Sequence, residues 1–286
     1  MVKTMCLAGF VALLNCWPPA HADTECASCH AATATEFHTT AHARAFESRA
    51  GIAACTTCHG DATRHLVSPG TPGSILGFDS EPATTVNAAC GGCHTDQHKT
   101  AANPHTSAGL ACTNCHTVHG ENQQVDVRRS LPAGLDRVDA ASLTCFSCHQ
   151  DTFTQFAFNE RHRLAEGSIS CASCHDPHAP ARMRLGGAVD QVCTTCHADA
   201  AGPFVFEHTA SRVEGCTACH SPHGSPNRHL LTHQQVGALC YSCHASVPQF
   251  HLGFSPVGAA RFDEDTVCTN CHVTIHGSNL DRLFLR

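Results

Sequence analysis

Cysteine and histidine recur along this chain in one fixed arrangement, C-x-x-C-H. The 286 residues include 22 cysteines and 25 histidines, and all but two of the cysteines form C-x-x-C pairs that are followed at once by histidine. The paired cysteines are Cys26, Cys29, Cys55, Cys58, Cys90, Cys93, Cys112, Cys115, Cys145, Cys148, Cys171, Cys174, Cys193, Cys196, Cys216, Cys219, Cys240, Cys243, Cys268 and Cys271. The histidines that complete the ten motifs are His30, His59, His94, His116, His149, His175, His197, His220, His244 and His272.

This motif is the attachment signal of c-type haem. On one helical turn the two cysteines lie on the same face, so both thiols reach the vinyl groups at one edge of a porphyrin. The histidine that follows lies on that face too and supplies the proximal imidazole to the iron. The sequence therefore predicts ten covalently bound haem c groups.

Two other uses of paired cysteines explain the sequence less well. Zinc sites also use C-x-x-C, but they group four ligands around each ion and give no reason for a histidine after every pair. In an oxidising compartment the same cysteines would form ten disulfides, which again leaves the histidines unexplained.

Histidine must also supply the second iron ligand at nearly every haem. Methionine is the common alternative, and Met183 is the only methionine after residue 22. At least one further histidine occurs between each motif and the next, and another follows the last motif. Taking one per interval predicts the distal ligands His42, His65, His105, His119, His162, His178, His208, His223, His251 and His276.

This assignment leaves four histidines over: His38, His98, His229 and His233. We interpret them as surface residues, because solvated imidazoles are common. His38 or His98 is an alternative to His42 or His105, and His229 is a candidate ligand across subunits.

Three of the distal candidates, His119, His178 and His223, lie only three residues after a proximal histidine. Such a short span does not reach the opposite face of the same haem. We therefore expect these histidines to bind the iron of a neighbouring haem. For His223 we expect the haem attached at Cys193 and Cys196.

The first 22 residues predict an export signal. Lys3 precedes a short apolar stretch, and Ala20-His21-Ala22 has the small-x-small pattern of a cleavage site before Asp23. A buried N-terminal helix and lipid attachment at Cys16 are the alternatives. No later apolar run has the length of about 18 residues that a membrane helix needs.

The charge balance excludes one broad class of partner. Charged residues make up 14% of the chain and the formal net charge is −7. Without a basic surface for phosphate backbones, nucleic-acid binding is disfavoured.

The motifs must be positioned by a repetitive array, because they begin 22 to 35 residues apart. We predict short α-helices and coil wrapped around an elongated chain of ten haems, with little β-structure, because so few residues per haem leave the porphyrins to form the apolar core. Residues 23–144 hold the longer loops and residues 145–286 the tighter spacing, without a clear linker.

Three stretches resemble one family. Residues 202–208 (GPFVFEH) with 216–225 (CTACHSPHGS) are similar to a signature of the DmsE/MtrA-type decahaem cytochromes. Residues 270–279 (NCHVTIHGSN) resemble that family's ending, and the spacing of Phe37, Thr40 and His42 fits its start. The resemblance implies haems with two histidine ligands in a near-linear array, which is often held inside an outer-membrane β-barrel porin.

A haem with two protein ligands has no open position for a substrate, so the residues favour an electron carrier over an enzyme. We expect a periplasmic protein associated with the outer membrane through a porin, with periplasmic redox proteins and an extracellular cytochrome as further partners. The alternatives are a soluble periplasmic shuttle or filament, and a multihaem reductase. A reductase needs a vacant or lysine-ligated haem, whereas every motif here ends in histidine.

Overall fold

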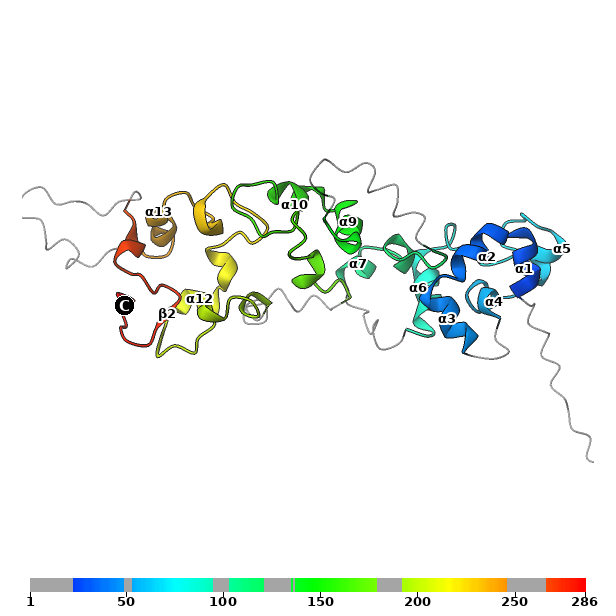
Figure 1. Cartoon of the computed structure of the whole chain (residues 1–286), viewed down its shortest axis with the longest axis horizontal. Helices are drawn as coiled ribbons and strands as arrows, with labels where there is room; N and C mark the ends of the chain where they lie inside the picture. Colours follow the sequence, from blue (N-terminus) through cyan, green and yellow to red (C-terminus); the bar gives the residue numbers. More distant parts are fainter. Residues whose placement is uncertain are drawn as a thin grey trace, which may run out of the picture. The chain divides into compact units, whose positions relative to one another are not determined.

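The computed structural model describes residues 23–48, 53–94, 103–120, 135, 137–178, 192–245 and 266–286. Contacts divide the chain into two units, and Figure 1 labels most of their helices and strands. Unit 1 comprises residues 1–90 and 116–121, and unit 2 comprises residues 91–115 and 122–286. The predicted division near residue 144 concerns the spacing of the haems and stays a prediction, as does the export signal, which lies outside the described residues.

Unit 1 is built from short helices, several of which carry a C-x-x-C-H motif. They are α1 (Asp23–Cys29), α2 (Ala31–Phe37), α3 (Ala41–Glu47), α4 (Ala54–His59), α5 (Thr63–Val67) and α6 (Ala83–Gly91), the last of which ends in unit 2. Asp23 at the start of α1 also caps α4, because its carboxylate accepts hydrogen bonds from the backbone N–H groups of Ala54 (3.0 Å) and Cys55 (3.1 Å). This contact fixes the first two motifs against each other.

Unit 2 has even shorter elements. They are α7 (Pro104–Ser107), η1 (Cys112–Asn114), α9 (Ala140–Phe146), α10 (Gln150–Gln155), η2 (Cys171–Ser173), η4 (Ala198–Ala200), β1 (Phe206–Glu207), α12 (Thr209–Val213), η5 (Cys216–Ala218), η6 (Arg228–Leu230), α13 (Val236–Tyr241), η8 (Cys268–Asn270) and β2 (Gly277–Ser278). β1 and β2 pair antiparallel, with Phe206 opposite Ser278 and Glu207 opposite Gly277. This small pairing joins the end of the chain to the segment before α12.

Side-chain caps start the helices of unit 2 that lead into functional residues. The Asp139 carboxylate accepts a hydrogen bond from the backbone N–H of Ser142 over 2.9 Å, at the start of the helix that carries Cys145. Asn103 caps α7 in the same way by accepting from the backbone N–H of His105 over 2.8 Å. Both caps act locally, so these helices need little packing to begin at a fixed residue.

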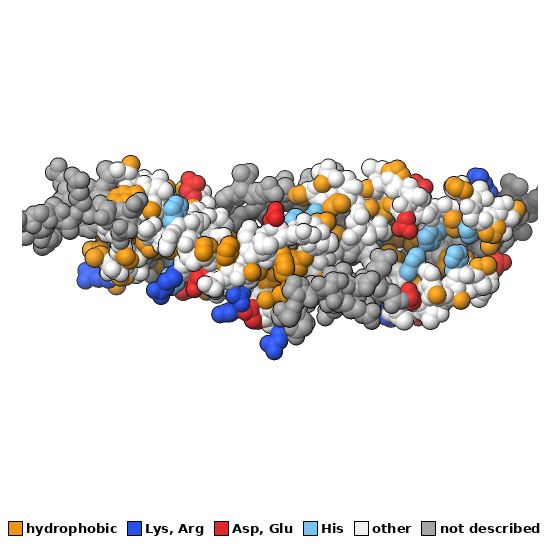
Figure 2. Space-filling model, turned by 90° about the horizontal axis from the view of Figure 1, so that it is seen from above, with side chains coloured by type: hydrophobic (Ala, Val, Ile, Leu, Met, Phe, Trp, Pro, Cys, Tyr) orange, Lys and Arg blue, Asp and Glu red, His pale blue; other side chains and the backbone are white. Residues whose placement is uncertain are grey.

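Few hydrophobic side chains are buried in the described residues. Val86, Val138 and Leu164 are the largest that are fully buried, whereas Val67, Val205 and Leu280 are 70 to 79% exposed. Figure 2 shows hydrophobic side chains spread over the visible face with histidines among them. The predicted fold class, short helices and coil with little β-structure, is confirmed. None of the described helices has the length and apolar character needed to cross a membrane.

Candidate haem sites

The C-x-x-C-H motifs form the expected helical turns. In seven of them the backbone N–H of the histidine donates to the carbonyl oxygen of the first cysteine over 2.9 to 3.0 Å, as from His220 to Cys216. This bond spans four residues, so it places the histidine on the same face as the two thiols. All twenty motif cysteines lie in the described part of the chain, and none of them is joined to another in a disulfide, as attachment to a porphyrin requires.

Seven of the motif histidines each lie beside one further histidine. The distances between ring centroids are 5.8 to 6.2 Å in every case. The second member of each pair is one of the ten predicted distal ligands. The pairs are His30 with His65, His59 with His119, His149 with His105, His175 with His223, His197 with His162, His220 with His276, and His244 with His208.

These separations fit one iron ion between the two rings of each pair. Two metal–nitrogen bonds of about 2 Å each, with about 1 Å from each nitrogen to its own ring centre, place the centroids about 6 Å apart. Directly stacked imidazoles would lie closer, and unrelated surface histidines would show no common distance. Such a donor set would suit a six-coordinate haem with two histidine ligands.

Backbone carbonyl groups orient the imidazoles of three motif histidines. The Nδ1 atoms of His59, His220 and His272 donate to the carbonyl oxygens of Leu76 (2.7 Å), His229 (2.8 Å) and Leu283 (2.5 Å). A hydrogen bond at Nδ1 fixes the tautomer and leaves Nε2 as the metal-binding atom.

Four of the distal candidates have surroundings that favour the neutral imidazole. Burial lowers the pKa values of His119, His208, His223 and His276, and the paired histidine lowers each pKa further. A neutral imidazole is the form that binds a metal ion.

The partners in each pair are distant in sequence, with at least one complete motif between them. His105, His162 and His208 precede the motif histidine that they face. His119, His223 and His276 follow the motif histidine that they face, and two motifs intervene. Every described pair therefore ties together segments that are not consecutive along the chain.

The structure corrects the expected partner of His223. Its ring lies 5.9 Å from that of His175, whereas His197 faces His162 instead. The reason is a tight backbone contact after the motif. Ser225 N–H donates to the Glu160 carbonyl over 2.8 Å, and Gly224 packs so closely against the Gln155 carbonyl that a Cβ atom would overlap with it.

Successive motifs of unit 2 meet at their cysteines. The hydrogen bond between the Cys145 and Cys171 thiols raises the pKa of Cys145 and lowers the pKa of Cys171 to about 6. Burial and the neighbouring Cys268 raise the pKa of Cys240 to about 11. Because these cysteines would bind the porphyrin edges, adjacent cysteines would bring the corresponding haem edges close to each other.

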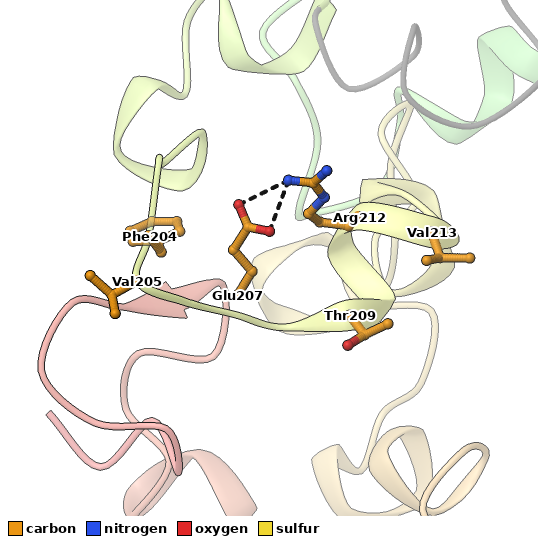
Figure 3. A pocket seen from close by; sticks show the side chains of 6 residues that line it. All are labelled: Phe204, Val205, Glu207, Thr209, Arg212 and Val213. Atoms are coloured by element: carbon orange, nitrogen blue, oxygen red, sulfur yellow. Dashed lines mark hydrogen bonds and ion pairs between the residues drawn. The ribbon is translucent and has the colours of Figure 1, made fainter.

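A pocket is lined by residues that precede and follow His208 in the chain (Figure 3). Phe204 and Val205 line one side, and Val213 of α12 lines another. Between them Arg212 donates to both oxygens of the Glu207 carboxylate, over 2.8 and 3.1 Å. This ion pair bridges β1 and α12 and so fixes the backbone on both sides of His208.

The remaining sequence predictions concern residues for which no ring pair is described. His42 and His178, with the proximal histidines His94, His116 and His272, lie in the described part of the chain, and their ligand roles stay predictions. His251 and the spare residue His98 lie outside it. For His229 the sequence predicts a surface residue or a ligand across subunits. In the structure the backbone carbonyl of His229 accepts a hydrogen bond from the motif histidine His220. Every residue has a carbonyl, so residue type gives no signal for this role.

Comparisons with known proteins agree with this geometry. Residues 104–198 match the family model described as cytochrome c3, and residues 208–249 match the model described as a doubled CXXCH motif. The multiheme cytochrome MtrA of Shewanella baltica (strain OS185) is 30% identical over 237 residues, which cover 79% of this chain and 68% of that protein. The paired imidazoles, the haem-attachment motifs and this relative together show that the chain belongs to the MtrA-type family of multihaem c-type cytochromes, which transfer electrons.

Proposed function

We propose that this chain is an exported cytochrome with ten haem c groups that passes electrons between periplasmic carriers and a partner at the outer membrane. The observation that carries the proposal is the set of seven histidine pairs at a common separation of about 6 Å, which fits iron between two imidazoles. Haem c held in this way supplies a one-electron couple and no vacant position for a substrate.

The residues of the chain perform three tasks in this function. The cysteines anchor each group at one edge, and the paired histidines hold it from both faces. Contacts between motif segments, such as the hydrogen bond from Cys171 N–H to the Ser142 hydroxyl in the helix of Cys145, hold neighbouring groups close together. Electron transfer weakens steeply with distance, so this proximity makes a continuous path through successive sites.

The proposal extends to the three sites without a described histidine pair. There we assign His42, His178 and His251 as distal ligands because each is the predicted histidine of its interval. Methionine does not replace them at more than one site, because Met183 alone follows the predicted signal.

Intact mass and spin state test the number and ligation of the haems. We expect the exported protein to begin at Asp23 and to carry ten haems. We also expect its oxidised spectrum to be low-spin throughout, and its reduced form not to bind carbon monoxide. Fewer than nine haems, retention of Cys6, or a substantial high-spin fraction would contradict the proposal.

The partner at the outer membrane is proposed to be a β-barrel porin. The predicted signal sequence and the family resemblance support this assignment, and the direction of electron flow does not affect it. A tagged chain expressed in its own host should co-purify with a barrel protein from outer-membrane fractions. Recovery of all the cytochrome from the periplasm without such a protein would instead favour a soluble shuttle.

A further inference from the structure

Two segments of the chain return to the motif that precedes them and contact its histidine. The first return loop, residues 221–231, follows His220, and the second, residues 273–286, follows His272. In both loops a backbone carbonyl accepts the Nδ1 hydrogen bond of the motif histidine, from His220 to His229 and from His272 to Leu283.

The acceptor carbonyls lie in backbone that is unusual for their residue types. His229 and Leu230 have φ angles of 56° and 58°, and Phe284, which follows Leu283, has a φ angle of 61°. Residues with a Cβ atom rarely adopt this left-handed conformation, and strain of this kind persists only where the surroundings impose it.

The surroundings of the first return loop impose this conformation through several hydrogen bonds. Ser221 N–H donates to the Leu230 carbonyl over 2.7 Å. The Ser225 hydroxyl and the Asn227 side-chain amide both donate to the Leu231 carbonyl, over 2.6 and 2.9 Å. The strained turn is therefore held from both sides.

A different segment of the chain also holds this loop. The Glu160 carboxylate accepts from the backbone N–H of His229 over 3.1 Å, and the Glu160 carbonyl accepts from Ser225 N–H. The orientation of His220 therefore depends on residues that touch neither the histidine nor its cysteines.

The second return loop repeats the arrangement. Its residues 276–278 and 282–285 read HGS and RLFL, where the first loop has HGS at 223–225 and RHLL at 228–231. Thr274 N–H donates to the Phe284 carbonyl over 3.1 Å, and the Ser278 hydroxyl donates to the backbone oxygen of Arg286. Phe284 thus corresponds to Leu230, and Leu283 to His229.

Five other described motif histidines lack this contact, whereas His59 makes a contact of the same kind with the Leu76 carbonyl. Within the described part of the chain, the rings of His30, His149, His175, His197 and His244 donate no hydrogen bond to a backbone carbonyl. The carbonyl contact therefore distinguishes sites along the chain from one another.

We propose that the two return loops are positioning elements that lower the reduction potentials of the haems attached at Cys216/Cys219 and at Cys268/Cys271. Donation from Nδ1 to a fixed carbonyl makes the imidazole a stronger base, and a stronger basic ligand stabilises the more highly charged ferric iron. The inference rests on the proposed function, because it requires His220 and His272 to be axial ligands.

A pair of substitutions at Leu230 tests the role of the first loop without changing charge. Leu230→Val places a β-branched residue where the left-handed conformation is required, whereas Leu230→Gly removes the strain and keeps the turn. If only side-chain packing mattered, the glycine variant would be the more disturbed of the two. The proposal predicts the opposite order.

The measurements are the potential of each haem in an NMR-monitored redox titration and the exchange rate of the His220 Nδ1 proton. In Leu230→Val we expect the potential of the haem at Cys216/Cys219 to rise and the proton to exchange faster, while Leu230→Gly stays close to the unaltered protein. Equal shifts in both variants, or none in either, would overturn the proposal.

Glu160 gives a second test if Leu230→Val does not fold. Glu160→Ala removes the acceptor for His229 N–H, and Glu160→Gln removes the same charge but keeps an acceptor oxygen. The potential should rise more in Glu160→Ala than in Glu160→Gln, and equal rises would show an effect of charge alone. Every variant keeps both axial histidines. A variant whose iron stays low-spin and whose potential does not shift would therefore refute the role of the return loops and leave the proposed function standing. A high-spin iron at this site in the unaltered protein refutes the proposed function.

Discussion

His162 donates a hydrogen bond from its Nδ1 atom to the carbonyl oxygen of Pro222 over 2.5 Å. Pro222 lies between His220 and His223, whose rings face His276 and His175. His162 itself faces His197. Four consecutive residues, 220–223, thus contact the proposed axial ligands of three different haems, so a disturbance in this segment should affect all three sites.

Replacement of His223 by alanine should open one identifiable iron. Because His223 faces His175, we expect the haem attached at Cys171 and Cys174 to become five-coordinate or water-ligated and to bind carbon monoxide when reduced. Assigned NMR spectra would locate it. His229→Ala is the matched control and should leave every iron low-spin. An open iron at the haem attached to Cys193 and Cys196 would instead support the haem that the sequence predicts for His223.

Gly224 should not tolerate a side chain. A Cβ atom at this position would overlap with the Gln155 carbonyl, which is backbone and has little freedom to move. We expect Gly224→Ala to lower the free energy of unfolding by about 1–3 kcal/mol, as overpacking commonly does. Thermal denaturation of the haem-loaded protein would measure the change.

The same substitution should weaken the ligation by His223, because this contact determines where His223 lies. Gly77→Ala is the control, since a Cβ atom there meets only the Ser80 hydroxyl at an ordinary 3.5 Å. Equal stability of the two variants would show that the loop adjusts without strain.

The relative orientation of the paired imidazoles should be visible by electron paramagnetic resonance. The ring planes of His105 and His149 cross at 79°, and those of His162 and His197 at 67°. The other five pairs have angles of 9 to 37°. Near-perpendicular imidazoles leave two iron d orbitals close in energy, so we expect large-gmax signals from two of these sites and rhombic signals from the other five. A spectrum with only rhombic low-spin species would contradict these angles.

Asp23 should make the stability of unit 1 depend on pH. Burial raises its pKa, but hydrogen bonds from the backbone N–H groups of Cys55 and Ala54 outweigh burial and hold the pKa below the usual value of 3.8. A depressed pKa means that the carboxylate stabilises the fold above the unfolded-state pKa, and that this stabilisation is lost as the pH falls through the folded-state pKa.

We expect Asp23→Ala to cost about 0.5–2 kcal/mol at neutral pH, as the loss of a helix cap does. Denaturant titrations at pH 7 and at a series of acidic pH values would measure the difference between the variant and the unaltered chain. The two proteins should converge as the pH falls through the folded-state pKa of Asp23. A constant difference would mean that the charge of Asp23 does not contribute.

The sequence alone is sufficient to predict the local part of each site, the C-x-x-C-H turn. A turn of C-x-x-C-H depends on residues within four positions of each other, and His220 lies over Cys216 as that spacing requires. The scarcity of methionine likewise restricts the second ligand to histidine at nearly every site on composition alone.

The choice of partner for each histidine could not be predicted in the same way. Spacing excludes His223 from its own haem, but it does not distinguish His175 from His197 as the facing residue. That choice depends on the close approach of Gly224 to Gln155, which involves backbone atoms and leaves no mark in the pattern of histidines. The repeated HGS, with the RHLL and RLFL segments that follow it, is a sequence signal for the return loops. The hydrogen bonds to the motif histidines can be recognised only from the backbone geometry.

The separation of the paired histidines along the chain has a consequence for the order of assembly. An exported chain emerges from its N-terminal end, so His59 would appear long before His119, and His175 long before His223, and these haem sites would wait for segments that come much later. By contrast, His105 is already present when His149 is made. A partly exported chain would therefore pass through stages in which some irons lacked their second ligand and were open to small molecules that the finished protein would exclude.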